Sequence, residues 1–266
     1  ALDALEGEPG EGLTVDEQHL RMAFLEQAAA AANRMGARER ERVHLDKLAD
    51  LGVDPASDPF RTARIYLMHG RHARDTGAFG MARGLFRNAY EFAKEAKRPL
   101  LEARSLALLA KVLAEGGDLE KAKQNSTKAW DLAKKHKDTP GSGPILAGTA
   151  LTRAHVAVLR GRPDRALLFV DRALKILRKN QTTIEPGLRA RAHLLRARIW
   201  RDLGRPARAR GSANRARELA QLAQERALES EAAARLGGLF VDAGQLEEAE
   251  AHLRDALLIA REIEDK

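Results

Sequence analysis

A glycine followed by an alanine five residues later recurs along the chain, and this repeat constrains the fold more than any other sequence feature. Successive glycines are 40, 44, 43 and 40 residues apart, and a second alanine follows the first by seven residues each time. A fixed period of this length indicates stacked supersecondary units that mainly contact their neighbours. The pairs are Gly77/Ala82, Gly117/Ala122, Gly161/Ala166, Gly204/Ala209 and Gly244/Ala249.

Each unit has the pattern of two amphipathic helices joined by a tight turn. The glycine stands where the first helix ends, because a residue without Cβ adopts the left-handed conformation at little cost. Pro163 and Pro206 fall at the first turn of the second helix, where the missing N–H costs nothing. Asp118 is a candidate N-cap at the same place in its repeat. The two alanines share one helical face and allow close approach of two backbones.

The pattern resembles the tetratricopeptide repeat (TPR), over about residues 61–266. The residues that carry it in the first and last full repeats are Tyr66, Gly70, Gly77, Ala82, Phe86 and Ala89, and Leu236, Gly237, Phe240, Gly244, Ala249, Leu253 and Ala256. Arg153 and Arg196 stand where the family has leucine, and Ala157 replaces the aromatic residue. Because the period exceeds the usual ~34 residues, the chain looks like the longer-helix variety of kinesin light chains and bacterial maltose-regulator-type proteins.

This resemblance implies an all-α fold, a right-handed α-solenoid of antiparallel helix pairs forming a TPR-like superhelix. We expect a disordered segment at residues 1–13, a divergent helix pair at 14–58 and five repeats within 59–266. The repeats are expected at about 59–97, 99–137, 144–179, 183–222 and 224–266, with the Thr139–Pro144 stretch as a long loop.

Several local signals support these bounds. Thr14 and Glu17 form a capping-box pattern, and Asp58-Pro59 pairs a cap with a proline at the first helical turn. Thr183 is a further candidate cap. In the N-terminal pair, Glu41 stands at the first alanine position, so this pair is expected to diverge from the others.

Composition excludes several classes of function. The chain has no cysteine, which rules out disulfides and thiolate chemistry. No Ser/His/Asp set or HExxH motif stands out, so we predict no enzymatic activity, no cofactor and no metal. His69 and His72 are three residues apart on a helix and could share a metal ion, but no third ligand lies at metal spacing, which favours a packing role.

The apolar runs, the first residue and the charge distribution indicate where the protein acts and whether it is part of a longer chain. No apolar run approaches the ~20 residues of a membrane span, and we expect a cytoplasmic protein. The chain begins at Ala1 without methionine, as expected of a fragment of a larger protein. Charge is uneven: residues 1–60 contain 6 basic and 13 acidic residues, whereas residues 149–220 contain 18 and 5.

The candidate partner-binding residues form a basic stripe on the predicted first helices, which line the concave groove in the family. Spacings of seven and ten residues place each set on one helical face, and the stacked sets would suit carboxylates or phosphates. The alternative is that these cations are solvated and locally paired, for instance Arg71 with Asp75. The stripe comprises Arg64, Arg71, Arg74, Arg104, Lys111, His155, Arg191, Arg198 and Arg201.

We therefore predict a protein–protein interaction scaffold or sensor module, part of a larger regulatory protein, that binds an acidic peptide or partner. Arg71 and Lys111 stand where the family's carboxylate clamp has asparagine, which argues against chaperone-tail binding. The alternative is a nucleic-acid-binding solenoid acting through phosphate contacts of the arginine-rich segment 189–217, although few aromatic residues are available for base stacking.

The last predicted helix contains five consecutive apolar residues, Ala256 to Ala260. They cover more than one helical turn, so one neighbouring helix cannot hide them all. We expect leucine or isoleucine on the far side to face water unless further repeats, or a second copy in a homo-oligomer, cover it.

Overall fold

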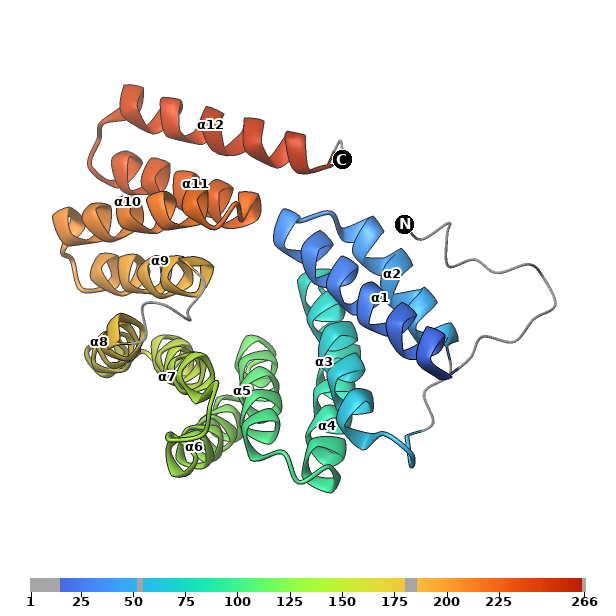
Figure 1. Ribbon diagram of the computed structural model, residues 1–266. Helices are drawn as coiled ribbons and strands as arrows, with labels where there is room; N and C mark the ends of the chain where they lie inside the picture. The colour runs from blue at the N-terminus through green and yellow to red at the C-terminus, as the bar shows by residue number, and fades with distance from the viewer. Residues whose placement is uncertain (1–14, 52–54, 180–185, 265–266) are drawn as a thin grey trace.

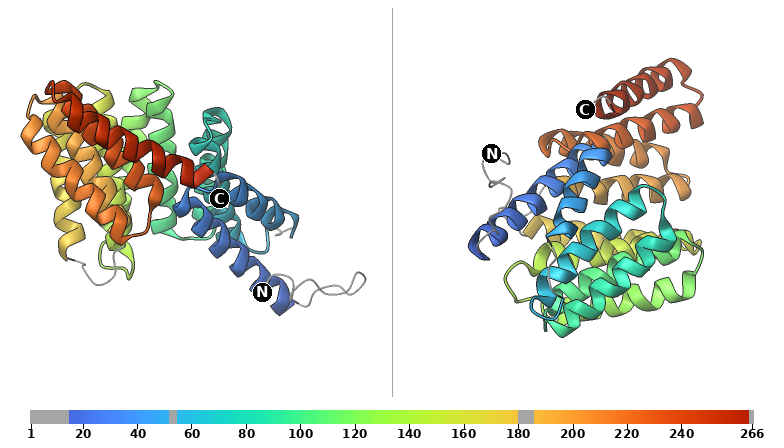
Figure 2. Two further views of the ribbon diagram at one scale, coloured as in Figure 1. Left: turned by 90° about the horizontal axis from the view of Figure 1, so that it is seen from above. Right: turned by 90° about the vertical axis from the view of Figure 1, so that its right-hand side faces the viewer.

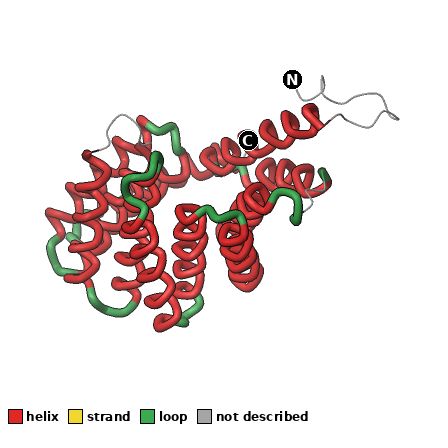
Figure 3. The backbone as a smooth tube through the Cα atoms, turned by 60° about the horizontal axis from the view of Figure 1, so that its bottom comes forward, coloured by secondary structure: helices red, strands yellow, loops and turns green. Residues whose placement is uncertain are grey.

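The computed structural model describes residues 15–51, 55–179 and 186–264, and in these ranges the chain forms twelve α-helices and no strand (Figures 1 and 3). The all-α prediction is confirmed. The helices are α1 (Val15–Met35), α2 (Arg38–Asp50), α3 (Pro59–Asp75), α4 (Phe79–Glu95), α5 (Pro99–Glu115), α6 (Leu119–Lys135), α7 (Ser142–Leu159), α8 (Pro163–Lys179), α9 (Pro186–Asp202), α10 (Pro206–Leu222), α11 (Arg226–Asp242) and α12 (Leu246–Glu264).

The repeated glycines make the turns within the helix pairs. Gly77 has a φ of +83°, and the other four repeat glycines and Gly36 are also left-handed. At the first of these turns, the Gly77 N–H donates to the Arg74 carbonyl at 3.0 Å and the Ala78 N–H to the Ala73 carbonyl at 2.7 Å. These bonds satisfy carbonyl groups at the helix end and reverse the chain.

Two turns between pairs use the same geometry without glycine. Lys97 and Gln224 have φ values of 51° and 54°, and the Glu225 N–H donates to the Ala220 carbonyl at 3.0 Å. The end of α10 is therefore marked by a left-handed glutamine, which carries no signal in the sequence because that conformation is uncommon for residues other than glycine.

Helix starts agree with the predicted caps, with one difference. The Asp58 carboxylate accepts from the Arg61 N–H at 2.8 Å, and Asp118 accepts from the Lys121 N–H at 3.2 Å. The predicted loop through Pro144 is too long, since α7 begins at Ser142. Proline is tolerated there because the first four N–H groups of a helix have no intrahelical partner. Thr14 and Thr183 lie outside the described residues.

Small residues hold the two helices of each pair together. The repeat alanines are buried, from 0% exposed at Ala82 and Ala122 to 6% at Ala256. A Cβ added at Gly70 would lie 2.6 Å from a ring carbon of Phe86, and one added at Gly237 would lie 2.6 Å from Leu253 Cγ. In both repeats the second helix thus places a bulky side chain directly on a glycine of the first.

The N-terminal pair replaces this contact with a polar one. Glu41, at the first alanine position, is only 3% exposed. Its carboxylate accepts from Asn33 Nδ2 at 2.8 Å and from Arg38 Nη1 at 2.8 Å, and lies 3.2 Å from His72 Nδ1 on α3. A buried carboxylate is tolerated here because it is paired and hydrogen-bonded.

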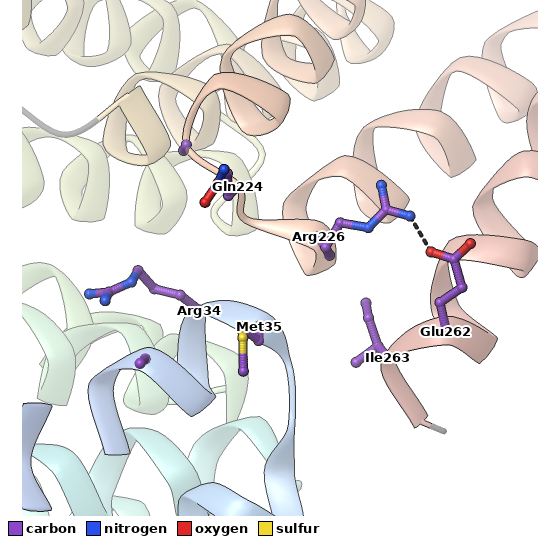
Figure 4. A pocket seen from close by; sticks show the side chains of 8 residues that line it. Arg34, Met35, Gln224, Arg226, Glu262 and Ile263 are labelled. Carbon is purple, nitrogen blue, oxygen red and sulfur yellow. Dashed lines mark hydrogen bonds and ion pairs between the residues drawn. The ribbon is translucent and has the colours of Figure 1, made fainter. Parts of the chain in front are cut away.

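The solenoid curves until its two ends meet. Helix α1 contacts α11, and in all three views the end of α12 lies beside the α1–α2 pair (Figures 1 and 2). A Cβ added at Gly36 would lie 2.7 Å from Ile263 Cγ2. Beside this contact is a pocket of about 260 Å³, with Arg34 and Met35 on one side and Gln224, Arg226 and Glu262 on the other (Figure 4).

Helix α12 is apolar on more than one side, as expected. Leu257 and Leu258 are 52% and 58% exposed, and Leu253 is 43% exposed. Ile259, by contrast, is 3% exposed because it belongs to the face that packs on α11. Among the described helices, none combines the length and apolar character that crossing a membrane requires.

Substitution of two adjacent glycines in α11, Gly237 and Gly238, tests whether the close contact between α11 and α12 stabilises the repeat. Gly237→Ala should lower the free energy of unfolding by about 1–3 kcal/mol, because its methyl group would collide with Leu253. Gly238→Ala should raise it by about 0.5–1 kcal/mol, because no atom lies within 4 Å of an added Cβ and alanine favours the helix. Urea unfolding of both variants measures this; equal effects would contradict the proposed contact.

Candidate functional site on the inner face of the ring

The first helices of the pairs form a continuous inner layer. Helix α1 contacts α3, α3 contacts α5, and the series continues through α7, α9 and α11 back to α1. We call the cationic surface of α3, α5, α7 and α9 the inner face. Its members are Arg71, Arg74, Arg104, Lys111, His155, Arg191 and Arg198.

Arg71 of α3 is at the centre of the inner face. Burial lowers the pKa of its guanidinium to about 9, and Arg104, Arg191 and Arg74 contribute to this lowering. Its buried Nε has no hydrogen-bond partner, and within the described chain no carboxylate is within ion-pair distance of it. Burial and the like charges around it therefore disfavour the charged form of Arg71, and no ion pair offsets them.

The local pairing expected for Arg71 is wrong. Asp75 is bound by Arg74, whose Nε donates to Oδ1 at 2.9 Å, and by Arg38 Nη2 at 3.3 Å. Burial alone would raise the pKa of Asp75, but these two arginines and Lys111 hold it below its usual value. Asp75, which is four residues from Arg71 and was its expected partner, therefore pairs with the neighbouring Arg74 instead.

Lys111 and His155 share one carboxylate. Glu115 Oε1 lies 4.0 Å from Lys111 Nζ and 3.6 Å from His155 Nε2. Burial, followed by the charge of Arg74, lowers the pKa of Lys111. Burial, then Lys111, Arg198 and Arg74, lowers the pKa of His155 to about 4, so the imidazole is neutral at pH 7.

Two predicted site residues lie away from this cluster. Arg64 pairs with Glu26 of α1 at 2.5 Å and lies over the Phe60 ring, so it joins α1 to α3. Arg201 pairs with Asp242 of α11 at 2.6 Å and is half exposed. Both are locally paired, as the alternative interpretation of the stripe expected.

Glu225 was not identified from the sequence. Its carboxylate, 5% exposed, accepts from Arg191 Nη2 at 2.8 Å. It fits because residue 187 is glycine, where an added Cβ would lie 1.7 Å from Oε1. These residues meet because the α10–α11 turn lies close to α9. That turn contains no glycine or proline, so its position could not be predicted from the sequence.

The inner face holds cations that no carboxylate of the described residues neutralises. Arg71 and Arg198 have no ion-pair partner in the part of the chain that the structure describes. Within the same ranges, no group of three or more His, Asp or Glu side chains could hold a metal ion. His72, one of the two candidate metal ligands, is engaged by Glu41.

No protein-family model matches the chain, and no curated protein matches it in sequence. Solved structures do match. TTC0263, a thermophilic TPR protein in Thermus thermophilus, is 22% identical with a TM-score of 0.54, over 75% of this chain and 92% of its own. The chain has the fold of a TPR-type α-solenoid.

Two structures of complexes share this TPR-type fold. A Rap protein complexed with competence and sporulation factor is 16% identical with a TM-score of 0.69, over 93% of this chain and 77% of that one. NprR in complex with its cognate peptide NprX is 14% identical with a TM-score of 0.68, over 98% and 72%. At these identities the likeness extends to the fold alone.

His155 should make the stability of the protein depend on pH. The unfolded chain binds a proton near pH 6.5, whereas the folded chain binds it only near pH 4. Stability therefore falls as pH falls through this window, by up to ~3 kcal/mol from this residue. Urea unfolding at pH 7.5 and 4.5 should show a smaller loss for His155→Gln than for the native chain; an identical loss would contradict the burial of a neutral imidazole.

Proposed function

We propose that the protein binds an acidic peptide, or an acidic segment of a protein partner, on the inner face, and serves as the interaction or sensor module of a larger regulatory protein. Arg71 carries this proposal. A half-buried charge that is surrounded by other arginines and has no carboxylate beside it destabilises the fold. A carboxylate of the ligand would pair with Arg71 and neutralise this charge. The free energy of that pairing would favour binding, because no carboxylate of the protein provides it in the unbound state.

The fold supports a peptide over a small anion. Cations are distributed over α3, α5 and α9, so an extended ligand could contact several of them at once. The Rap protein and NprR structures, with the same fold, are complexes with competence and sporulation factor and with the NprX peptide. We infer the same class of ligand here, with acidity as the feature that the cations of this chain would select.

Two other interactions remain proposals. Nucleic acid is the alternative ligand, because cations could contact phosphates without base recognition. The exposed leucines of α12 are available for self-association, which is independent of the inner face.

The experiment is a fluorescence anisotropy titration with labelled synthetic decapeptides that carry zero, two or four Asp/Glu residues. Affinity should rise with the number of carboxylates. Arg198→Ala should weaken binding of the most acidic peptide by about tenfold or more, the usual effect of losing a hydrogen bond to a charged group. Arg201→Ala is the matched control three residues away, and it should have little effect because Arg201 is engaged by Asp242.

Arg71→Met gives a second, sharper signature. It should raise the melting temperature, because it removes a half-buried unpaired charge, and should weaken peptide binding. A residue of purely structural importance would lower both. Peptide affinity unrelated to acidity, or equal effects of Arg198→Ala and Arg201→Ala, would refute the proposal. Tight binding of a random oligonucleotide with a steep salt dependence would favour the alternative.

A further inference from the structure

A second cationic site lies between α9 and α10. An open hollow of about 340 Å³ is bounded by these two helices. We call it the outer pocket. Helix α9 contributes His193, Arg196 and Trp200, and α10 contributes Arg208, Ser212 and Arg215. These positions are three, four or seven residues apart on each helix, so each set shares one face.

Two of the three guanidinium groups of the outer pocket pair with a carboxylate, and the third does not. Arg196 Nη2 lies 3.2 Å from Asp171 of α8, and Arg215 Nη1 lies 2.5 Å from Glu218. Arg208 has no ion-pair partner among the described residues; its guanidinium lies over the Trp200 ring, 4.8 Å from the centroid. Stacking holds this cation at the pocket without neutralising it.

Two nitrogen atoms in the wall of the outer pocket also lack hydrogen-bond partners. Arg196 Nε and His193 Nδ1 are buried and without a hydrogen-bond partner. Burial, followed by Arg196, Arg215 and Arg189, lowers the pKa of His193 to about 4. The imidazole is thus neutral in a positive environment, and Ser212 adds a hydroxyl group to the same wall.

We propose that the outer pocket binds a phosphate monoester, either on a small molecule or on a phosphorylated side chain. A phosphate monoester presents three terminal oxygens in different directions and a charge near −2. Guanidinium groups arriving from two helices can contact those oxygens as paired donors. A single carboxylate has only two oxygens in one plane and would leave one arginine unused.

A polynucleotide fits the outer pocket less well. Backbone-tracking surfaces combine a row of cations with aromatic rings on which bases stack. Here the cations converge on one hollow, and Arg208 covers one face of Trp200. The proposed ligand is therefore one phosphate group, and this site is separate from the inner face proposed to bind acidic peptides.

Gly211 provides a clean way to test the site. It lines the outer pocket within α10, and a Cβ added there meets no atom within 4 Å. Gly211→Glu therefore introduces a carboxylate into the pocket without a steric clash at Cβ. Gly211→Ala is the matched control, because it makes the same backbone change without the charge.

The assay is isothermal titration calorimetry of the full chain with inorganic phosphate, O-phosphoserine tripeptide, its unphosphorylated form, and a random single-stranded oligonucleotide. We expect binding of phosphate and phosphoserine but not of the unphosphorylated peptide. Gly211→Glu and Arg208→Ala should each weaken binding about tenfold or more, whereas Gly211→Ala and the inner-face variant Arg198→Ala should retain it. Stronger binding of the tripeptide than of phosphate would identify a phosphorylated side chain as the source, and the reverse a small molecule.

Three outcomes overturn the proposal. These are an absence of phosphate binding, phosphate binding that Gly211→Glu leaves unchanged, and binding of the oligonucleotide without binding of phosphoserine or phosphate. Circular dichroism of each variant establishes that a loss of binding is not a loss of fold.

Discussion

The contact between a small residue on one helix and the facing helix sets the geometry of this protein. Gly70 receives Phe86, Gly237 receives Leu253, and buried alanines fill the same seam in each repeat. Because side chains there are minimal, helix spacing is fixed within narrow limits by van der Waals contact. Repetition of one spacing gives a steady curvature, and the two ends of the described chain meet where Gly36 receives Ile263. The same device thus packs the pairs and closes the ring.

Closure determines the electrostatics of the inside. On an open surface, Arg71 and its neighbours would be hydrated and screened. In the ring, burial of Arg71 on α3, followed by the charges of Arg104 on α5 and of Arg191 on α9, which is distant in the sequence, lowers its pKa to about 9. A charge left uncompensated in this way lowers stability, which is a common cost of binding sites and agrees with the function proposed for the inner face. The outer pocket is less strained, because Asp171 and Glu218 balance two of its three arginines.

Local signals predicted the helices, the left-handed glycines and the buried alanines, because each depends on residues within one repeat. Most of the cationic cluster was also predicted, since helical spacing places Arg71 and Arg74 on one side of α3 and the repeat register places Lys111 of α5 at the corresponding position. Contacts that depend on tertiary packing were not accessible in this way. The competition of Arg74 for Asp75, the Arg191–Glu225 pair and the burial of Ile259 all depend on how neighbouring helices are rotated. The left-handed conformation of Gln224 was not predicted, because residues other than glycine seldom adopt it.

Ring closure is the central claim, and it can be measured directly. The chain has no cysteine, so Arg40→Cys with Arg261→Cys places one spin label near each end, both at exposed positions. Double electron–electron resonance should give one narrow, short distance distribution, which should broaden and lengthen when Ile263→Asp removes the apolar contact with Gly36. A broad, long distribution in the otherwise native chain, unchanged by Ile263→Asp, would contradict the closed ring and with it the account of the inner face.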